Sequence, residues 1–198
     1  MSHIIRAVRS EDWPRVKELR LTALQDPVAH LAFLETREQA LARPDDSWRE
    51  RTDRAAEGET LLQLVAEQPD GRWLGTVTVL VEPAGELGLF GDVPEQSQTH
   101  LVGVFVRPEA RGTGLAHELF GAALEWSWEL TEPRVERVRL FVHEDNTRAE
   151  AMYRRAGFAR TGEFVPAPGD GSAKDLELAV ARSGARTTDR GREDRARP

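Results

Sequence analysis

The spacing of hydrophobic residues in the first third of the chain predicts one strand followed by helices. A short apolar run from Ile4 to Val8 indicates a strand. Apolar residues then recur about once per helical turn as far as Gln25, and Asp12 is placed to cap that helix. Further helical segments are expected after the Asp26–Pro27 break, and a short one from Asp46 onward.

The middle of the chain predicts a β-hairpin followed by a long loop. Residues 60–67 and 73–81 are rich in Leu and Val, and turn-forming residues 69–72 lie between them. Gly and Pro recur through residues 82–98, which predicts a loop inserted before a central strand at 99–106. Loops of this length often shape binding sites.

The second half alternates helices and strands. Residues 115–131 predict a helix, 135–142 a strand, and a further helix is expected to end at Gly157. Residues 158–165 and 175–180 predict a final strand pair. The buried stripe of the 115–131 helix is expected to consist of Leu115, Leu119, Ala122, Trp126 and Leu130. The succession predicts an α/β fold with a mixed sheet.

Length and composition support one folded domain. The 198 residues fit a single domain, and an apolar fraction of 39% before Gly is counted is typical of a globular protein. Residues 1–181 are expected to form this domain. Residues 182–198 lack apolar periodicity and are expected to be a disordered, Arg-rich tail.

Charge and cysteine content exclude several classes of function. The formal net charge of −7 argues against nucleic-acid binding, and six Arg against three acids in the tail do not change that. Without Cys there is no disulfide, zinc-thiolate site or cysteine nucleophile, and the His residues lack metal-site spacing. No signal-peptide pattern or run of about 18 apolar residues is present, so a cytoplasmic protein with no membrane partner is expected.

The most informative local pattern is residues 102–116, where an apolar strand turns through Gly112 and Gly114 directly into a helix. Gly has no Cβ, so the backbone can turn tightly and approach a ligand, while the unpaired N–H groups of the first helical turn face it. Such a turn attracts phosphate. The motifs of nucleoside triphosphate and dinucleotide loops are absent.

Residues 138–158 form a second strand-and-helix pattern. Asp145 or Asn146 is placed to cap the helix, and Gly157 supplies its end. One face of this helix is expected to consist of Ala149, Met152, Tyr153 and Ala156.

Together the two segments resemble the GCN5-related N-acetyltransferase (GNAT) family. The pattern R-x-x-G-x-A at 111–116 resembles the loop that holds the acyl-CoA pyrophosphate, and N-x-x-A-x-x-x-Y-x-x-x-G-F at 146–158 resembles the second signature of that family. The resemblance implies a single GNAT-type acyl-CoA N-acyltransferase domain. Its implied activity is direct transfer of the acetyl group from acetyl-CoA, as cosubstrate, to a primary amine.

The resemblance also implies which residues contact acetyl-CoA. The backbone N–H groups of the loop hold the pyrophosphate, and the Arg adds charge. The residues of this loop are Arg111, Gly112, Thr113, Gly114, Leu115 and Ala116. In the family the preceding strand diverges from the next one, which puts Val104, Phe105 and Val106 beside the pantetheine arm, although their side chains equally suit a core. Asn146 suits both a helix cap and a contact to that arm.

Two residues are candidates for proton transfer. By resemblance, Tyr153 is the general acid that protonates the CoA thiolate, and the alternative is a buried aromatic. His100 lies where several protein-acetylating members carry a glutamate base, and its side chain titrates in a suitable range. The alternative for His100 is a strand-end residue that faces solvent or core. Glu82, Glu86 and Asp92 compete for the role of base, although each individually suits a solvated loop charge better.

The sequence does not decide whether the acceptor is a small-molecule amine or a protein amine. By resemblance, Phe33, Leu34 and Trp48 are expected to line its pocket, and the acidic body suits a cationic acceptor. A non-catalytic acyl-CoA-binding sensor with the same fold is the alternative function. The oligomeric state also stays open, with a homodimer among the alternatives.

Overall fold

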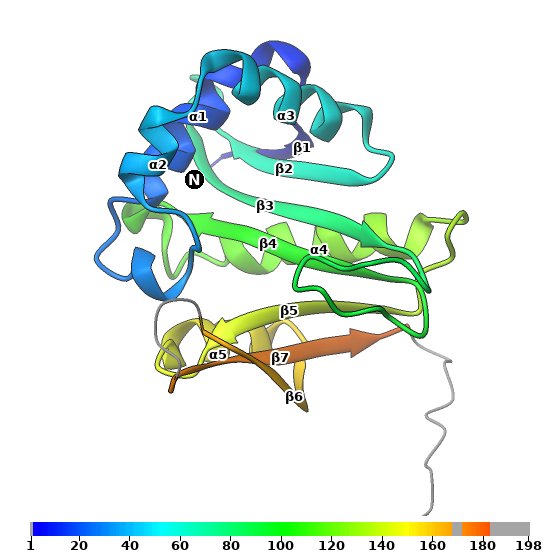
Figure 1. Ribbon diagram of the computed structural model, residues 1–198. Coiled ribbons are helices and arrows are strands. Elements are labelled where there is room, and N and C mark those ends of the chain that lie inside the picture. The colour runs from blue at the N-terminus through cyan, green and yellow to red at the C-terminus, as the bar shows by residue number, and fades with distance from the viewer. Residues whose placement is uncertain (1, 168–171, 183–198) are drawn as a thin grey trace, which may run out of the picture.

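The fold is a seven-stranded mixed sheet with helices on both faces, seen in a computed structural model that describes residues 2–167 and 172–182 (Figure 1). The strands lie in the order β1-β2-β3-β4-β5-β7-β6, and every neighbouring pair is antiparallel except β4 and β5. The strands are β1 (Ile4–Ala7), β2 (Leu61–Glu67), β3 (Trp73–Glu82), β4 (Gln98–Val106), β5 (Arg137–His143), β6 (Ala159–Pro166) and β7 (Lys174–Ala181). The predicted α/β fold with a mixed sheet is confirmed.

Helices from the two halves of the chain cover opposite faces of the sheet. On one face lie α1 (Trp13–Ala23), α2 (Arg37–Ala42) and α3 (Asp45–Glu57), and on the other lie α4 (Leu115–Glu129) and α5 (Thr147–Arg155). Short 3₁₀ turns are η1 (Ser10–Asp12), η2 (Ala29–Leu31) and η3 (Pro108–Ala110). The helix expected to be short from Asp46 is α3, which begins one residue earlier and has 13 residues.

Each face of the sheet has its own hydrophobic core. The core beneath α4 and α5 contains Leu74, Leu101, Leu119, Leu140 and Tyr153 among others. The core beneath α1–α3 contains Leu19, Trp48, Val65, Trp73 and Phe105. Side chains alternate across a strand, so neighbouring positions such as Val65 and Leu64 serve different cores.

The predicted buried stripe of α4 is partly wrong. Leu115 and Leu119 are buried as expected, but Ala122 and Trp126 are only half-buried. The residues buried beside the first two are Phe120, Ala123 and Ser127. Helix α4 carries apolar residues around most of its circumference, so its sequence does not fix which row of side chains faces the sheet.

The parallel strands β4 and β5 separate along their length. They are paired only where residues 98–100 of β4 meet 137–139 of β5. In Figure 1 the two strands lie together at the right and diverge toward the left. A register irregularity between Thr76 and Thr78 of β3 bends β4 opposite, where Gly103 has a φ of 61°. Among the described residues, none pairs as a strand with residues 101–106 of β4 on their β5 side.

The first residue of the predicted tail contacts the rest of the structure. Arg182 donates hydrogen bonds to the backbone oxygens of Trp128 at 2.9 Å and Val135 at 2.8 Å. The division at residues 181 and 182 stays a prediction. Residues 183–198, the rest of the predicted tail, lie outside the described residues.

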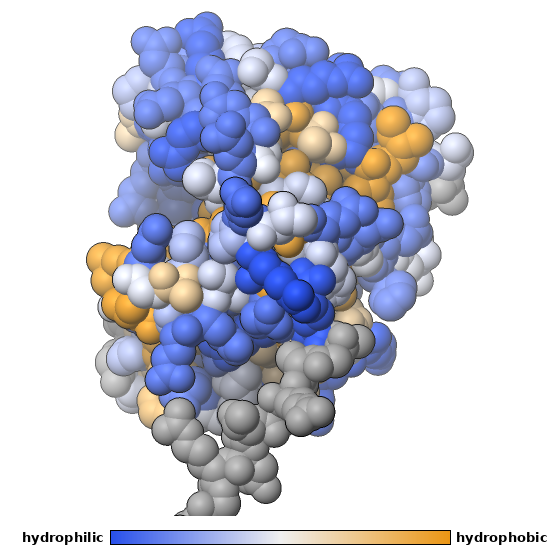
Figure 2. Space-filling view, turned by 90° about the vertical axis from the view of Figure 1, so that its right-hand side faces the viewer, coloured by the Kyte–Doolittle hydropathy of each residue, from blue (hydrophilic) through white to orange (hydrophobic). Residues whose placement is uncertain are grey.

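The outer surface is mostly polar. Figure 2 shows one face as largely hydrophilic, with apolar side chains in a few separate patches. Within residues 2–167 and 172–182, no helix combines the length and the apolar character needed to cross a lipid bilayer.

Candidate functional site

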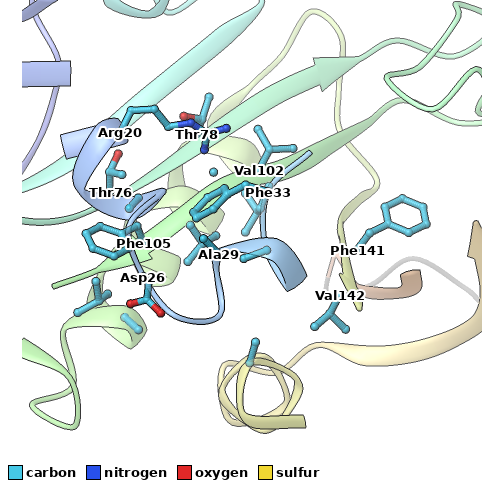
Figure 3. Close-up of a pocket in the computed structure, with 18 of the residues that line it drawn as sticks. Arg20, Asp26, Ala29, Phe33, Thr76, Thr78, Val102, Phe105, Phe141 and Val142 are labelled. Atoms are coloured by element: carbon cyan, nitrogen blue, oxygen red, sulfur yellow. The ribbon is translucent and has the colours of Figure 1, made fainter. Parts of the chain in front are cut away.

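The separation of β4 and β5 opens a cleft of about 1510 Å³ that reaches both faces of the sheet. Its walls come from the helices of the first half, from β4, from the loop before α4, and from β5 and α5. Figure 3 shows Phe33 and Phe105 on one side of this cleft, and Phe141 and Val142 of β5 on the other. The expected acceptor residues Phe33, Leu34 and Trp48 all line the cleft.

The glycine loop before α4 lies at one end of the cleft. Gly112 and Gly114 have φ values of 79° and 94°, a left-handed conformation that favours glycine. In the described part of the chain, no hydrogen bond is made by the backbone N–H groups of residues 112–116. Gly114 caps α4 and its carbonyl accepts from His117 at 2.9 Å. Unpaired donors at a helix start form a ready-made anion site.

Arg111 is held by the protein. Its Nε donates to the Val106 oxygen at 2.9 Å, and its Nη2 pairs with Asp26. Burial raises the pKa of Asp26, but the hydrogen bond from Arg111 outweighs it and holds that pKa below its ordinary value. Arg111 therefore ties the loop to the segment after α1, and its charge is already paired. Thr113 turns its hydroxyl inward to donate to the Ala110 oxygen at 2.8 Å.

The strand residues expected beside the cofactor arm line the cleft in the divergent part of β4. The Phe105 side chain is buried in the core beneath α1–α3, while Val104 and Val106 pack partly against the opposite core. What these residues offer to the cleft along the β5 side is therefore mainly their main-chain N–H and C=O groups.

Asn146 is the cap of α5. Its Oδ1 accepts from the Ala149 N–H at 3.2 Å, which decides between the two caps predicted for this helix. The side-chain amide N–H₂ of Asn146 has no partner among the described residues, and Asn146 lines the cleft. Both roles expected for Asn146 are therefore compatible, because they use different atoms.

Tyr153 projects from α5 into the core and reaches the cleft. Its ring packs at 5.5 Å from Phe120 and 6.4 Å from Phe158. Burial raises the pKa of Tyr153 to about 12. The hydroxyl has no hydrogen-bond partner in the described part of the chain. The side chain is thus a protonated donor that the protein leaves free.

His100 is buried in the middle of the sheet, which excludes the solvent-facing alternative. Its Nδ1 lies 3.0 Å from Oε1 of Glu82, and its ring contacts Phe90 and Phe141. If Nδ1 carries the proton, it donates to the carboxylate and leaves the Nε2 lone pair free as an acceptor. His100 lines the cleft, at the end away from the glycine loop.

Glu82 is not the solvated loop charge that the sequence favoured. It is the last residue of β3, is 5% exposed, and also accepts from Gln98 at 2.7 Å and Arg139 at 2.8 Å. Burial opposes its ionisation, but the hydrogen bond and charge of His100 and the charge of Arg139 lower the pKa of Glu82 to about 2. A carboxylate this acidic is a poor general base, although it orients His100 well.

The other two candidates for the general base, Asp92 and Glu86, lie in different surroundings. Asp92 pairs with Arg139 at 2.7 Å, which anchors the 83–97 insertion to β5. Glu86 is exposed, as expected. Neither lines the cleft, so neither is placed to take a proton from a bound acceptor.

One group of cleft residues was not predicted from the sequence. Arginines gather at the end of the cleft beneath α1–α3, beside a single glutamate, and these residues are Arg20, Arg43, Arg51, Arg54 and Glu35. The sequence carries one weak signal of this: Arg51 and Arg54 are spaced i and i+3 in a predicted helix and therefore share a face.

Comparison with protein families identifies the fold. The sequence model of the acetyltransferase (GNAT) family matches residues 13–158, which include the glycine loop, β5 and α5. The chain belongs to the acetyltransferase (GNAT) family. The family resemblance drawn from the two motif segments is thereby confirmed.

Curated GNAT relatives are similar to part of this chain. A mycothiol acetyltransferase from Arthrobacter sp. (strain FB24) is 36% identical over 97 residues, which cover 49% of this chain and 27% of that protein. A mycothiol acetyltransferase from Salinispora arenicola (strain CNS-205) is 33% identical over 137 residues, covering 61% of this chain and 43% of that protein. The chain thus spans less than half the length of these relatives.

Solved structures share the GNAT fold over nearly the whole chain. An acetyltransferase of the GNAT family from Streptococcus pneumoniae has a TM-score of 0.69 at 14% identity, covering 91% of this chain and 100% of that one. A spermidine N-acetyltransferase from Vibrio cholerae, in complex with CoA and spermine, has a TM-score of 0.65 at 18% identity, covering 91% and 96%. At these low sequence identities, the similarity shows a shared fold alone.

Proposed function

We propose that this chain transfers the acetyl group of acetyl-CoA to a primary amine. One observation carries the proposal: a single cleft joins a loop with unpaired N–H groups, an open strand edge, a protonated Tyr153 and the buried His100. Family membership and the names of the relatives, all acetyltransferases, support the same reaction class.

Acetyl-CoA suits the loop and the divergent strands. The N–H groups of residues 112–116 are free to bind the pyrophosphate, and the positive end of the α4 dipole favours its charge. The unpaired edge of Val104 to Val106 can bind the amides of the pantetheine arm in place of a strand. The amide of Asn146 offers a further donor.

The acetyl transfer itself requires two proton movements. The amine nitrogen attacks the thioester carbonyl carbon, and the C–S bond breaks as the tetrahedral intermediate collapses. In our proposal Tyr153 gives its proton to the departing thiolate, and the proton lost by the amine passes to Nε2 of His100, directly or through water. Glu82 acts through His100 as a positioning residue, because it fixes the tautomer that leaves Nε2 unprotonated.

A thiol-release assay tests this function. The chain is supplied with acetyl-CoA and a library of primary amines, and free CoA is measured. The proposal predicts amine-dependent release of CoA, with acetylated amine formed in equal amount. Binding of acetyl-CoA without release for any amine would instead identify a sensor that retains the fold.

A further inference from the structure

The end of the cleft beneath α1–α3 carries an excess of positive charge. Its charged lining residues are Arg20 of α1, Arg43 before α3, Arg51 and Arg54 of α3, and the single carboxylate Glu35. Figure 3 shows the Arg20 side chain extending from α1 toward the strands that carry Thr76 and Thr78. This local balance is opposite in sign to the net charge of −7 of the whole chain.

Glu35 already has two arginine partners. Its carboxylate pairs with Nε of Arg20 at 3.2 Å and with Nη2 of Arg43. Aromatic rings fix both guanidinium groups, because Arg20 lies 4.4 Å from the Phe33 ring centre and Arg43 lies 5.0 Å from that of Trp48. The Nη1 of Arg43 is buried without a hydrogen-bond partner in the described structure, so a rigid donor remains unused.

Arg51 and Arg54 have no carboxylate of their own. Within the described residues neither makes an ion pair or a side-chain hydrogen bond, and both line the cleft. Arg51 remains exposed to solvent in the open cleft. Even so, the surrounding protein and then the charge of Arg43 lower the pKa of Arg51, and burial likewise lowers that of Arg20. Arg51 and Arg54 therefore present to the cleft two guanidinium groups that have no carboxylate partner among the described residues.

We infer that the acceptor is a small-molecule amine that carries an oxyanion, a carboxylate or a phosphate, and that Arg51 and Arg54 bind this group. The inference rests on the proposed acetyl transfer, whose acceptor it specifies. Guanidinium groups suit both oxyanions because their planar forks donate paired hydrogen bonds. A polycationic acceptor would add like charge to the cluster, so the acidic body as a whole is a misleading guide to the acceptor.

A matched amine series tests the inference. Primary amines of equal chain length end in a methyl group, a carboxylate, a phosphate or a second ammonium group, and kcat/KM is measured for each by thiol release. We expect the carboxylate or the phosphate amine to exceed the methyl amine by about tenfold or more, as a charged hydrogen bond provides. The diamine is expected to be the poorest. The anionic amine with the higher kcat/KM shows whether the site prefers a carboxylate or a phosphate.

Substitutions in α3 test whether Arg51 and Arg54 cause the preference for anionic amines. Arg51→Gln and Arg54→Gln are expected to lower kcat/KM for the preferred anionic amine about tenfold, mainly through KM, with acetyl-CoA affinity and the methyl amine unaffected. The matched control is Arg49→Gln on the same helix, because Arg49 pairs with Asp46 at 2.7 Å and lies outside the cleft lining. This control should change none of these quantities.

The outcomes separate this inference from the proposed reaction. Equal kcat/KM for anionic and neutral amines, or a preference for the diamine, would overturn the inference and leave acetyl transfer standing. If no amine releases CoA, acetyl transfer fails, and calorimetric binding of the same amines to the protein with CoA decides the inference. The anionic amines must then bind more tightly than the methyl amine, and Arg51→Gln must abolish that difference.

Discussion

Tyr153 combines two properties that are hard to explain by packing alone. Its ring is an ordinary member of the aromatic group with Phe120 and Phe158, yet its hydroxyl points to the cleft without a partner in the described residues. A hydroxyl that is accessible from the cleft and has no protein partner is available to a bound ligand. Burial raises the pKa of Tyr153 to about 12, so the hydroxyl stays protonated at neutral pH but is a weaker acid than an ordinary phenol.

The Tyr153→Phe variant separates the chemical role from the structural one. It keeps the ring and its packing, so melting temperature and acetyl-CoA affinity should change little. Turnover should fall by about a hundredfold or more, the usual contribution of general acid catalysis. A turnover within about threefold of the original would assign proton delivery to water and leave Tyr153 as a packed aromatic.

His100 has the contacts of an oriented base. Replacing it with Gln keeps a donor for Glu82 and removes the lone pair of Nε2. We expect His100→Gln to lower kcat/KM about a hundredfold or more and to leave acetyl-CoA affinity unchanged. Thiol release and calorimetry measure the two quantities. A kcat/KM within about threefold of the original would place the base elsewhere.

At the residue scale, the sequence indicates which residues lie at the cleft better than it indicates their burial and their ion-pair partners. Asn146, Tyr153 and the residues of the glycine loop other than Thr113 line one cleft. Strand-to-helix turns and helix caps are encoded locally, so the sequence could indicate these residues. Arg111 pairs with Asp26, and the buried Glu82 pairs with Arg139. In both pairs the partners lie far apart in the chain, and a local sequence pattern carries no information about such contacts. For this reason the sequence predicts a solvated loop charge at Glu82.

The glycine loop and α4 act as one element. A Cβ at Gly114 would meet no atom of the described residues within 4 Å, so space does not require glycine there. The backbone does, since a φ of 94° is costly for any other residue. In this conformation the N–H groups of residues 112–116 make no hydrogen bond within the described residues.

Gly114→Val should therefore act on ligand binding more than on packing. We expect acetyl-CoA affinity to fall about tenfold or more, because the loop loses donors to the pyrophosphate. Gly121→Val is the matched control: Gly121 lies inside α4, its Cβ also meets open space, and its φ is ordinary. Isothermal calorimetry compares the two variants. Equal affinities in both folded proteins would argue against a pyrophosphate site at this loop.

Most helices and strands were predictable because each repeats a local period. The hairpin of β2 and β3 and the cap of α5 by Asn146 follow from alternation, turn residues and capping chemistry. The divergence of β4 from β5 was expected only through the family resemblance. The divergence depends on which strands become neighbours and on the bend at Gly103. The hydrophobic periodicity of the sequence predicts neither of these features.

At the scale of the whole molecule, a buried charged network crosses four strands. Glu82 of β3 pairs with Arg139 of β5, which also contacts Glu177 of β7 at 3.4 Å, and Arg137 joins Glu177 to Gln98 of β4. Arg139 and Glu177 are both about 2% exposed. Removing one partner of a buried ion pair leaves the other uncompensated, so the network links the stability of the whole sheet to the ionisation of Glu82.

The stability of the protein should therefore depend on Glu82 with a defined sign. The pKa of Glu82 is lowered from 4.5 to about 2 by folding, so its ionised form stabilises the folded state above pH 4.5, and this contribution is lost as the pH falls toward about 2. Glu82→Gln should cost about 3 kcal/mol of unfolding free energy at neutral pH. The difference from the original protein should shrink steadily below pH 4.5. Urea unfolding across this range measures it, with Glu86→Gln, an exposed residue of the insertion, as the control that should differ at no pH. A difference for Glu82→Gln that stays constant from neutral pH down to about pH 2 would mean that folding leaves the pKa of Glu82 unchanged, and the stabilisation of its charged form by His100 and Arg139 would fail with it.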